Sequence, residues 1–169
     1  MLALMLPGAP SRAADTDLAQ ENARQVVGLF LKSCVQFSGN RSGLLQWAKK
    51  TGLPELRDKQ AEAFLYGLPG MVYDAGTKDS RLVLVSEESG SCSAFSPLAD
   101  GPLVIQELER ILREQQVKLS VIGDKADTRE KTLNHREYTA SADKHEWQML
   151  VSTEQAPSGG EAMLTANSW

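Results

Sequence analysis

The segment "MVYDAGTKDSRLVLVSEESGSCSAFS", residues 71–96, decides the fold class, because the spacing of apolar residues changes there. It contains three short runs rich in β-branched and aromatic residues: "MVYDAG", "RLVLVSEE" and "SCSAFS". The turn-like sequences "GTKDS" and "SGS" separate them, which predicts three consecutive strands. Residues 82–85 are apolar on both faces, so we expect this strand inside the sheet.

The residues before this segment have helical spacing. Apolar side chains recur every three or four residues from Asp17 to Phe37, which predicts one long helix with Thr16 or Asp17 as its cap. The apolar face comprises Ala19, Ala23, Val26, Val27, Phe30, Cys34 and Phe37. Two shorter helices are predicted over residues 43–50 and 57–65, and the second runs into "GLPG".

The residues after the segment return to a helix and then to strands. A helix opens at Gly101-Pro102, and "VKLSVIG", "TLNHREYTA", "HEWQMLVST" and "EAMLTAN" follow as strand candidates. The order is therefore ααα-βββ-α-ββββ. It predicts an α+β fold with a mostly antiparallel sheet of about six to seven strands and helices packed on one face. Because no long linker or repeat interrupts the pattern, we expect a single domain over residues 14–169.

The hairpin around "SADK", residues 141–144, has a predictable register. With Ala142 and Asp143 as its turn, Tyr138 lies opposite Trp147, and Arg136 lies opposite Met149. One face, toward the helices, then carries Tyr138, Trp147, Met149 and Val151. The other face, toward water, carries His135, Glu137, Glu146 and Gln148.

Composition and the first residues indicate an exported chain. The 169 residues carry a formal net charge of -4, which does not favour binding to nucleic acid or to an anionic membrane surface. Residues 1–13 combine an apolar run with small residues at Ser11 and Ala13, as before a signal-peptidase site. We therefore predict a signal peptide, truncated at its start, that is cleaved before Ala14, and we expect no membrane span in the mature chain.

The two cysteines allow different interpretations. "GSCSA", residues 90–94, has the small residues of a nucleophile elbow, but strand-like sequence flanks Cys92 on both sides and an elbow requires a following helix. Cys34 lies on the apolar face of the first helix, which should cover the strand of Cys92. In an exported chain we therefore predict a disulfide between them. In a reducing compartment the alternative is two buried free thiols.

Other patterns of chemical interest have simpler explanations. In the predicted register His135 and His145 lie opposite Leu150 and Ala140, on different faces, so they cannot share a metal ion. "SADK" matches the S-x-x-K pattern of penicillin-interacting enzymes, but it lacks K-T-G and S-D-N partners and suits a hairpin turn. No segment has the glycine spacing of a phosphate loop. We predict no metal, no cofactor and no catalytic residue.

A group of motifs resembles a known family. They are "LFLKSC" (29–34), Trp47, "LPEL" (53–56), "AFLYGLPGMVYDAG" (63–76), "RLVLVSEESGSCSAF" (81–95) and "AMLTAN" (162–167). Together they resemble a family of small exported proteins and lipoproteins of proteobacteria. The resemblance covers most of the mature chain and implies an envelope location without a particular activity. Because no cysteine follows the predicted cleavage site, a free periplasmic form is favoured over a lipid-anchored one.

These observations favour a non-enzymatic periplasmic domain that binds another envelope or secreted protein, as an inhibitor, an immunity-type antagonist or an accessory factor. The candidate interface residues are Glu137, Glu146 and Gln148 on the polar sheet face, and Gly67 and Gly70 in the loop after the third helix. One alternative is an envelope hydrolase with Ser91, Ser141 or Cys92 as nucleophile. Another is a small-ligand carrier with an apolar cavity between sheet and helices.

Overall fold

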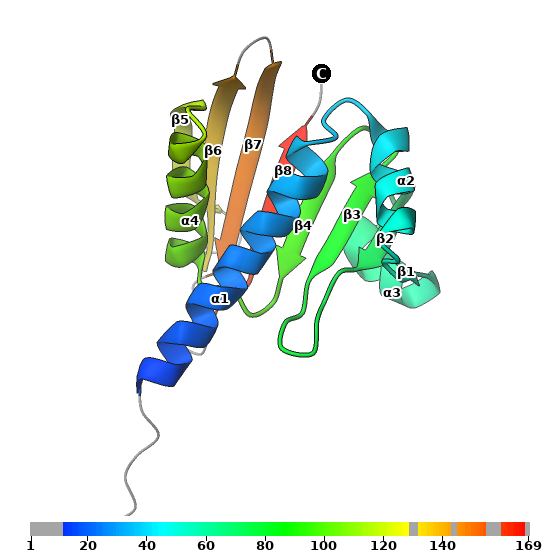
Figure 1. Cartoon of the computed structure of the whole chain (residues 1–169), viewed down its shortest axis with the longest axis horizontal. Helices are drawn as coiled ribbons and strands as arrows, with labels where there is room; N and C mark the ends of the chain where they lie inside the picture. Colours follow the sequence, from blue (N-terminus) through cyan, green and yellow to red (C-terminus); the bar gives the residue numbers. More distant parts are fainter. Residues whose placement is uncertain (1–11, 129–131, 143–144, 155–159, 168–169) are drawn as a thin grey trace, which may run out of the picture.

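The computed structural model describes residues 12–128, 132–142, 145–154 and 160–167 (Figure 1). The helices in this part of the chain are α1 (Arg12–Phe30), the π-helical turn η1 (Leu31–Val35), α2 (Arg41–Lys50), α3 (Asp58–Leu65) and α4 (Gly101–Glu114). The strands are β1 (Glu55–Leu56), β2 (Gly70–Asp74), β3 (Val83–Glu87), β4 (Cys92–Ser96), β5 (Lys118–Ala126), β6 (Leu133–Ala142), β7 (His145–Glu154) and β8 (Ala162–Asn167). The predicted α+β class is confirmed.

The strands form one antiparallel sheet in the order β1-β2-β3-β4-β8-β7-β6-β5. Two meanders, β1 to β4 and β5 to β8, meet where β4 pairs with β8, and Cys92 lies opposite Ala166 there. The seven predicted strands are present, and the described residues add an eighth, β1. Its two residues, between Pro54 and α3, are too few to produce an apolar period that sequence analysis can detect.

The longest helix starts earlier than predicted. α1 begins at Arg12, so Thr16 and Asp17 lie inside it and do not cap it. Ala13 and Ala14 have the highest helix propensity and extend the helix backwards. The predicted signal-peptide cleavage point before Ala14 therefore falls in the first turn of α1, and residues 1–11 lie outside the described residues.

The predicted apolar face of α1 forms the centre of the core. Ala23, Val26, Val27 and Phe30 are buried against the sheet, together with Cys34 in η1. α4 adds Val104 and Leu108, and α2 adds Leu44 and Ala48, to the same cluster. α4 begins as predicted, since Asp100 caps it by accepting a hydrogen bond from the Leu103 amide at 3.0 Å and Pro102 lies in its first turn.

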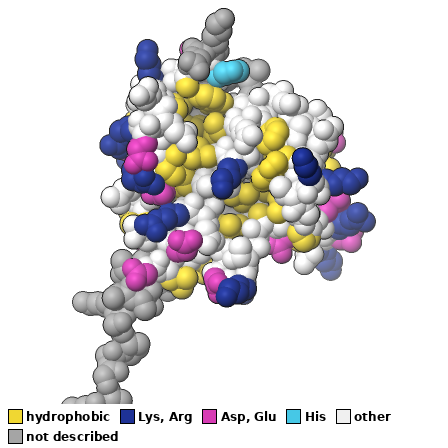
Figure 2. All heavy atoms as spheres, viewed as in Figure 1, with side chains coloured by type: hydrophobic (Ala, Val, Ile, Leu, Met, Phe, Trp, Pro, Cys, Tyr) yellow, Lys and Arg dark blue, Asp and Glu magenta, His cyan; other side chains and the backbone are white. Residues whose placement is uncertain are grey.

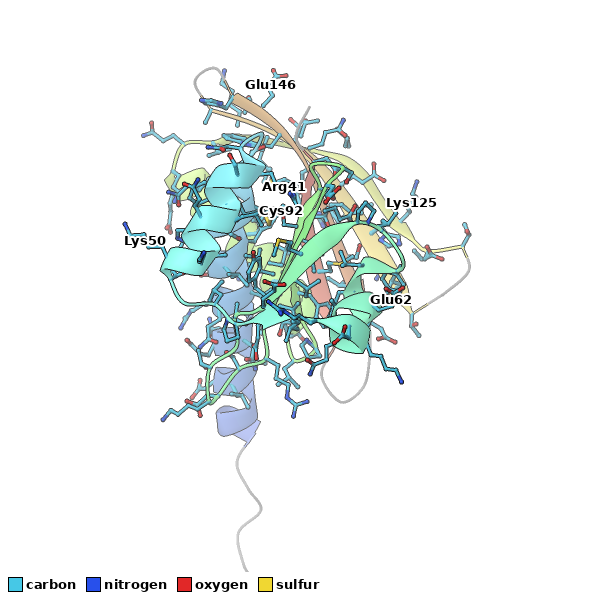
Figure 3. All side chains as sticks on the ribbon, turned by 90° about the vertical axis from the view of Figure 1, so that its right-hand side faces the viewer. Arg41, Lys50, Glu62, Cys92, Lys125 and Glu146 are labelled. Carbon is cyan, nitrogen blue, oxygen red and sulfur yellow. A yellow bond between two sulfur atoms is a disulfide. The ribbon has the colours of Figure 1, made fainter. Side chains whose placement is uncertain are left out.

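Helices lie on both faces of the sheet, whereas the sequence predicted them on one face. α3 packs on the face opposite to α1, where Leu65 contacts Val72 and Val85 in a second, smaller core. Figure 3 shows α1 and α2 on one side of the sheet and α3 on the other. The physical reason lies in β3, because Leu84 faces α1 while Val83 and Val85 face α3. A strand that is apolar on both faces requires cover on both.

The β6–β7 hairpin has a different register from the predicted one. Tyr138 pairs with Met149 and Arg136 pairs with Val151, because β6 continues to Ala142, which lies opposite His145. Every partner is therefore displaced by two residues, and the turn positions 143–144 lie outside the described residues. A displacement of two leaves each side chain on its predicted face, since side chains alternate with a period of two.

A polar network joins the sheet to α4. The buried Tyr138 hydroxyl donates a hydrogen bond of 3.0 Å to Glu109 in α4, and Arg136 forms ion pairs with Glu109 at 3.2 Å and Asp124 at 3.1 Å. Burial, followed by the hydrogen bond to Glu109, raises the pKa of Tyr138 well above its usual value.

Within the described residues, no helix is long and apolar enough to cross a membrane.

Candidate functional site

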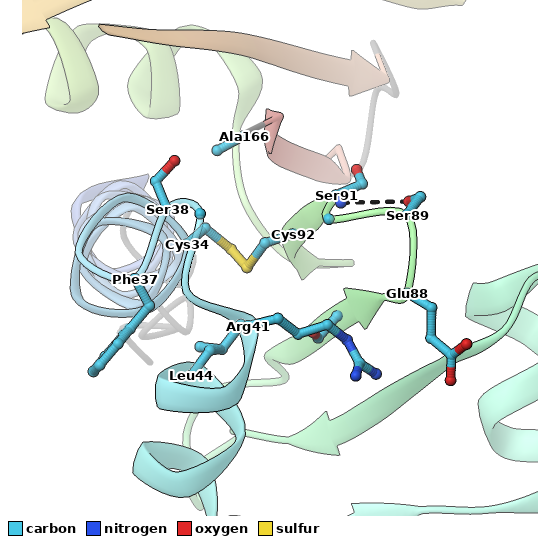
Figure 4. A pocket seen from close by; sticks show the side chains of 13 residues that line it. Cys34, Phe37, Ser38, Arg41, Leu44, Glu88, Ser89, Ser91, Cys92 and Ala166 are labelled. Carbon is cyan, nitrogen blue, oxygen red and sulfur yellow. Dashed lines mark hydrogen bonds between the residues drawn. A yellow bond between two sulfur atoms is a disulfide. The ribbon is translucent and has the colours of Figure 1, made fainter. Parts of the chain in front are cut away.

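The predicted disulfide is confirmed. Cys34 in η1 and Cys92 at the start of β4 are bonded, with their Cα atoms 5.2 Å apart (Figure 4). Cys92 therefore has no free thiol, and it continues into a strand where a nucleophile elbow would need a helix. The disulfide lines a small pocket of about 140 Å³, beside Arg41 and the turn that contains Ser89.

The two faces of the sheet offer different surfaces. On the α1 side, both signs of charge are interspersed with small apolar patches (Figure 2), which is typical of a solvated surface. On the other side, α3 covers β2 and β3 and contacts β4 through Phe64, and no other helix of the described residues lies over β8, β7 and β6. A groove of about 540 Å³ lies there, beside α3 and over β3, β4, β8, β7 and β6.

Aromatic side chains form the α3 side of the groove. Phe64 of α3 packs edge to face on Phe95 of β4, with ring centroids 5.6 Å apart. Tyr66 follows α3 and lines the groove with 85% of its surface exposed. Its backbone is left-handed, with a φ of 50°, and Gly67 follows with a φ of 82°. The turn therefore places the Tyr66 ring in solvent, outside the protein core.

Hydroxyl groups lie along the floor of the groove. Ser93 of β4 and Thr165 of β8 are directly paired across the strands, and their hydroxyl oxygens are 2.8 Å apart. Ser91 donates a hydrogen bond of 3.1 Å to the Asn167 side chain at one end. Met163 of β8 adds an apolar side chain that is 37% exposed. The floor thus combines apolar contact area with groups that can donate and accept hydrogen bonds.

His135 forms the far side of the groove. Its Nδ1 lies 2.9 Å from Ser152 Oγ, the residue directly opposite it on β7, and its Nε2 lies 3.1 Å from Asp127 Oδ2. The predicted partner of His135, Leu150, was wrong because of the displaced register, and so was the predicted pairing of His145 with Ala140. The two histidines do lie on opposite faces, since His145 stacks on Trp147 of the α1 face.

The Ser152, His135 and Asp127 side chains resemble a catalytic triad in composition but lack its supporting geometry. Ser152 lies within β7, between β6 and β8, so the main-chain amides around it belong to the sheet ladders. An oxyanion hole requires such amides to be free to donate to the substrate. In addition, Nδ1 and not Nε2 faces the serine, opposite to the usual triad. The arrangement fits a polar binding wall better than a nucleophile.

The predicted interface residues lie beside the groove and do not line it. Glu137, Glu146 and Gln148 are on the α3 side of the sheet, toward the β6–β7 hairpin. Gly67 lies in the connection that follows Tyr66, and Gly70 begins β2. Gly70 is required there, because a Cβ atom would lie 2.8 Å from the Ser86 carbonyl oxygen. None of these five residues is among those that line the groove.

Apart from Ser91 and His135, sequence reasoning did not single out the residues that line the groove. The lining comes from α3, from five strands and from residues next to them: Ala63, Phe64, Tyr66, Val85, Glu87, Ser91, Ser93, Phe95, Leu133, His135, Ser152, Glu154, Glu161, Ala162, Met163 and Thr165. One signal was available, because Tyr66 stands where a helix of this kind usually ends with glycine.

Comparison with known proteins does not assign the chain to a family. No protein-family model matches the chain, and no curated protein matches it. Within the described residues, no cluster of three or more His, Cys, Asp or Glu side chains could hold a metal ion.

Proposed function

We propose that this chain is a non-enzymatic protein-binding domain of the cell envelope, and that it binds a segment of its partner in the groove beside α3. The observation that carries the proposal is the uncovered sheet face itself. An antiparallel sheet can leave a polar face in water, but this face also presents Phe95 and the exposed Met163 beside α3, which covers β2 and β3 and reaches β4 through Phe64. A partner would supply the missing cover over β4, β8 and β7.

The location is part of the same proposal. A disulfide that joins the first helix to the sheet favours an oxidising compartment, because cytosolic thiols are kept reduced. The resemblance to small exported proteins of proteobacteria agrees with a periplasmic form. An inhibitor, an immunity-type antagonist and an accessory factor would each need a surface of this kind.

The two other predicted functions have less support. Of the three nucleophiles considered, Cys92 is in the disulfide, Ser91 is hydrogen-bonded to Asn167, and Ser141 lies in β6 opposite Glu146. The groove beside α3 is lined by hydroxyl groups and carboxylates as well as apolar side chains, whereas the predicted carrier requires an apolar cavity between sheet and helices.

Site-specific photocrosslinking tests the proposal. A benzoylphenylalanine at position 163 places the reactive group on the groove floor, and one at Leu18 of α1 is a matched exposed control on the opposite side. We expect a discrete adduct in envelope extract from position 163 alone. The partner, identified by mass spectrometry and purified, should bind wild type in a saturable manner and bind Met163→Glu more weakly. Equal adducts from both positions, or none, would contradict the proposal.

A further inference from the structure

We infer that the groove recognises an extended peptide segment of the partner that carries a Lys or Arg residue near each end. The inference rests on the proposed function and specifies the chemistry of the partner. Three features carry it: the strained position of Tyr66, the placement of carboxylates along the groove, and the distance between them.

Tyr66 occupies a position that disfavours it. A non-glycine residue in the left-handed conformation costs about 1–2 kcal/mol, and its ring gains little burial in return, since it is 85% exposed. Such local strain tends to concentrate at functional sites. An exposed aromatic face beside a carboxylate is suited to a Lys or Arg side chain, which would stack on the ring and pair with the acid. Glu87 of β3 lines the same groove, and its carboxylate, which accepts a hydrogen bond from Ser89, is the acid for such a pair.

All the acidic and basic side chains among the described residues that line the groove are glutamates, apart from His135. Glu87, Glu154 and Glu161 line it, and no Lys or Arg is among the described residues that do so. Lys125 lies opposite His135 on the neighbouring β5, outside the lining. Complementary charge steers a partner to a surface and fixes its register, so the groove selects against acidic segments and for basic ones.

The carboxylates lie at opposite ends of the groove. Glu87 ends β3 in line with Ser91, whereas Glu154 ends β7 in line with Glu161, at the other end of the strands. Three strand spacings across the sheet and about six residues along it separate the two, which corresponds to roughly 25 Å. A small molecule cannot contact both ends. An extended peptide spans this length with about eight residues, since each adds about 3.3 Å.

The peptide would contact side chains of the groove and would not add a strand to the sheet. β4, β8 and β7 each have a paired strand on both sides, so their main-chain groups are already used. The half-buried Thr165 hydroxyl, which is hydrogen-bonded to the buried Ser93, can instead donate to, or accept from, the main chain of the segment. Apolar residues between the two basic ones would contact Phe95 and Met163.

Selection from a phage-displayed library of random nonapeptides on the full, oxidised chain tests the inference. We expect the recovered peptides to be enriched in Lys or Arg at two positions that are six to eight residues apart. Recovered peptides that lack basic residues but need Tyr66 would overturn the charge specificity and leave the groove as a docking site. Peptides that bind wild type, Tyr66→Gly and Met163→Glu equally would overturn the groove itself, and with it the proposed function. A library that yields no binder would overturn the peptide inference alone.

Variants of the groove sharpen the test on one recovered peptide. Tyr66→Gly should weaken binding by about tenfold while its thermal midpoint stays equal to that of wild type or rises, since glycine relieves the left-handed strain. Leu68→Ala is the matched control, because Leu68 is exposed in the same turn but does not line the groove. Its affinity should not change. Glu87→Gln and Glu154→Gln should each weaken binding about threefold at low salt and reduce its salt dependence. Unchanged affinity in both would contradict the inference.

Discussion

Reduction of the Cys34–Cys92 disulfide should destabilise the fold by about 4 kcal/mol. The cysteines are 58 residues apart in the sequence. Closure of a loop of that length removes about 14 cal/mol/K of entropy from the unfolded chain, or about 4 kcal/mol at 25 °C. Typical domains have a net stability of about 5–15 kcal/mol, so this loss is a large fraction of the total. Reduction retains both sulfur atoms in the core, so it tests the crosslink with little change in packing.

Urea unfolding in the presence and absence of dithiothreitol measures this loss. Tryptophan fluorescence and far-UV circular dichroism should give coincident transitions for each form. For a slope of about 2 kcal/mol per molar urea, the midpoint should fall by about 2 M on reduction. The control is Cys34→Ala/Cys92→Ala, whose midpoint should lie close to that of the reduced chain and should not respond to dithiothreitol.

The position of the bond predicts where the reduced protein loosens first. Cys34 lies in η1, directly after α1, and Cys92 starts β4 at the centre of the sheet. Amide hydrogen exchange should therefore rise most in η1 and in the last turn of α1. A loss of less than about 1 kcal/mol on reduction would refute the loop-entropy reasoning. Uniform exchange along the chain would refute the local role of the bond.

Three further substitutions test the packing of the fold. Gly101→Ala should destabilise the fold by about 1–3 kcal/mol in chemical denaturation, because the new Cβ would lie 2.6 Å from Cβ of Thr153. Unchanged stability would show that α4 and β7 can move apart to accept the methyl group. Gly28→Ala in α1 should instead stabilise the fold by about 0.5–1 kcal/mol, since nothing lies within 4 Å and alanine favours the helix; a loss would contradict this packing. Tyr138→Phe should cost about 1.5–3 kcal/mol, because the hydrogen bond to Glu109 is lost. The pKa of Tyr138 is raised in the fold, so wild-type stability should decrease as pH rises above about 10, and this decrease should be smaller in Tyr138→Phe.

The local signals in the sequence predicted most elements correctly. Asp100, Gly101 and Pro102 predicted the start of α4, because capping depends only on neighbouring residues. Apolar residues with helical spacing predicted the buried face of α1, and the run at residues 82–85 predicted an inner strand. The Cys34–Cys92 pairing also followed from local faces, since a helix that covers a sheet brings its buried cysteine close to that of a strand.

The errors arose where long-range contacts decide the outcome. The hairpin register was displaced by two residues because β6 extends to Ala142, one residue beyond the predicted end, and turn preferences around "SADK" do not distinguish the two positions. The position of α3 depends on which sheet face lacked cover, and helical spacing does not report the side on which a helix packs.

The candidate site, like the fold, depends partly on local sequence signals and partly on long-range contacts. The sequence alone determined the α+β class, the cysteine pair and the two faces of the β6–β7 hairpin, because these follow from periods of about 2.0 and 3.6 residues within short segments. Only the tertiary structure decided that Tyr66, Glu87, Phe95 and His135 line one groove. The meanders meet at β4 and β8, so residues that are distant in sequence become neighbours on the uncovered face. No local period encodes that meeting, because it is a property of the strand order.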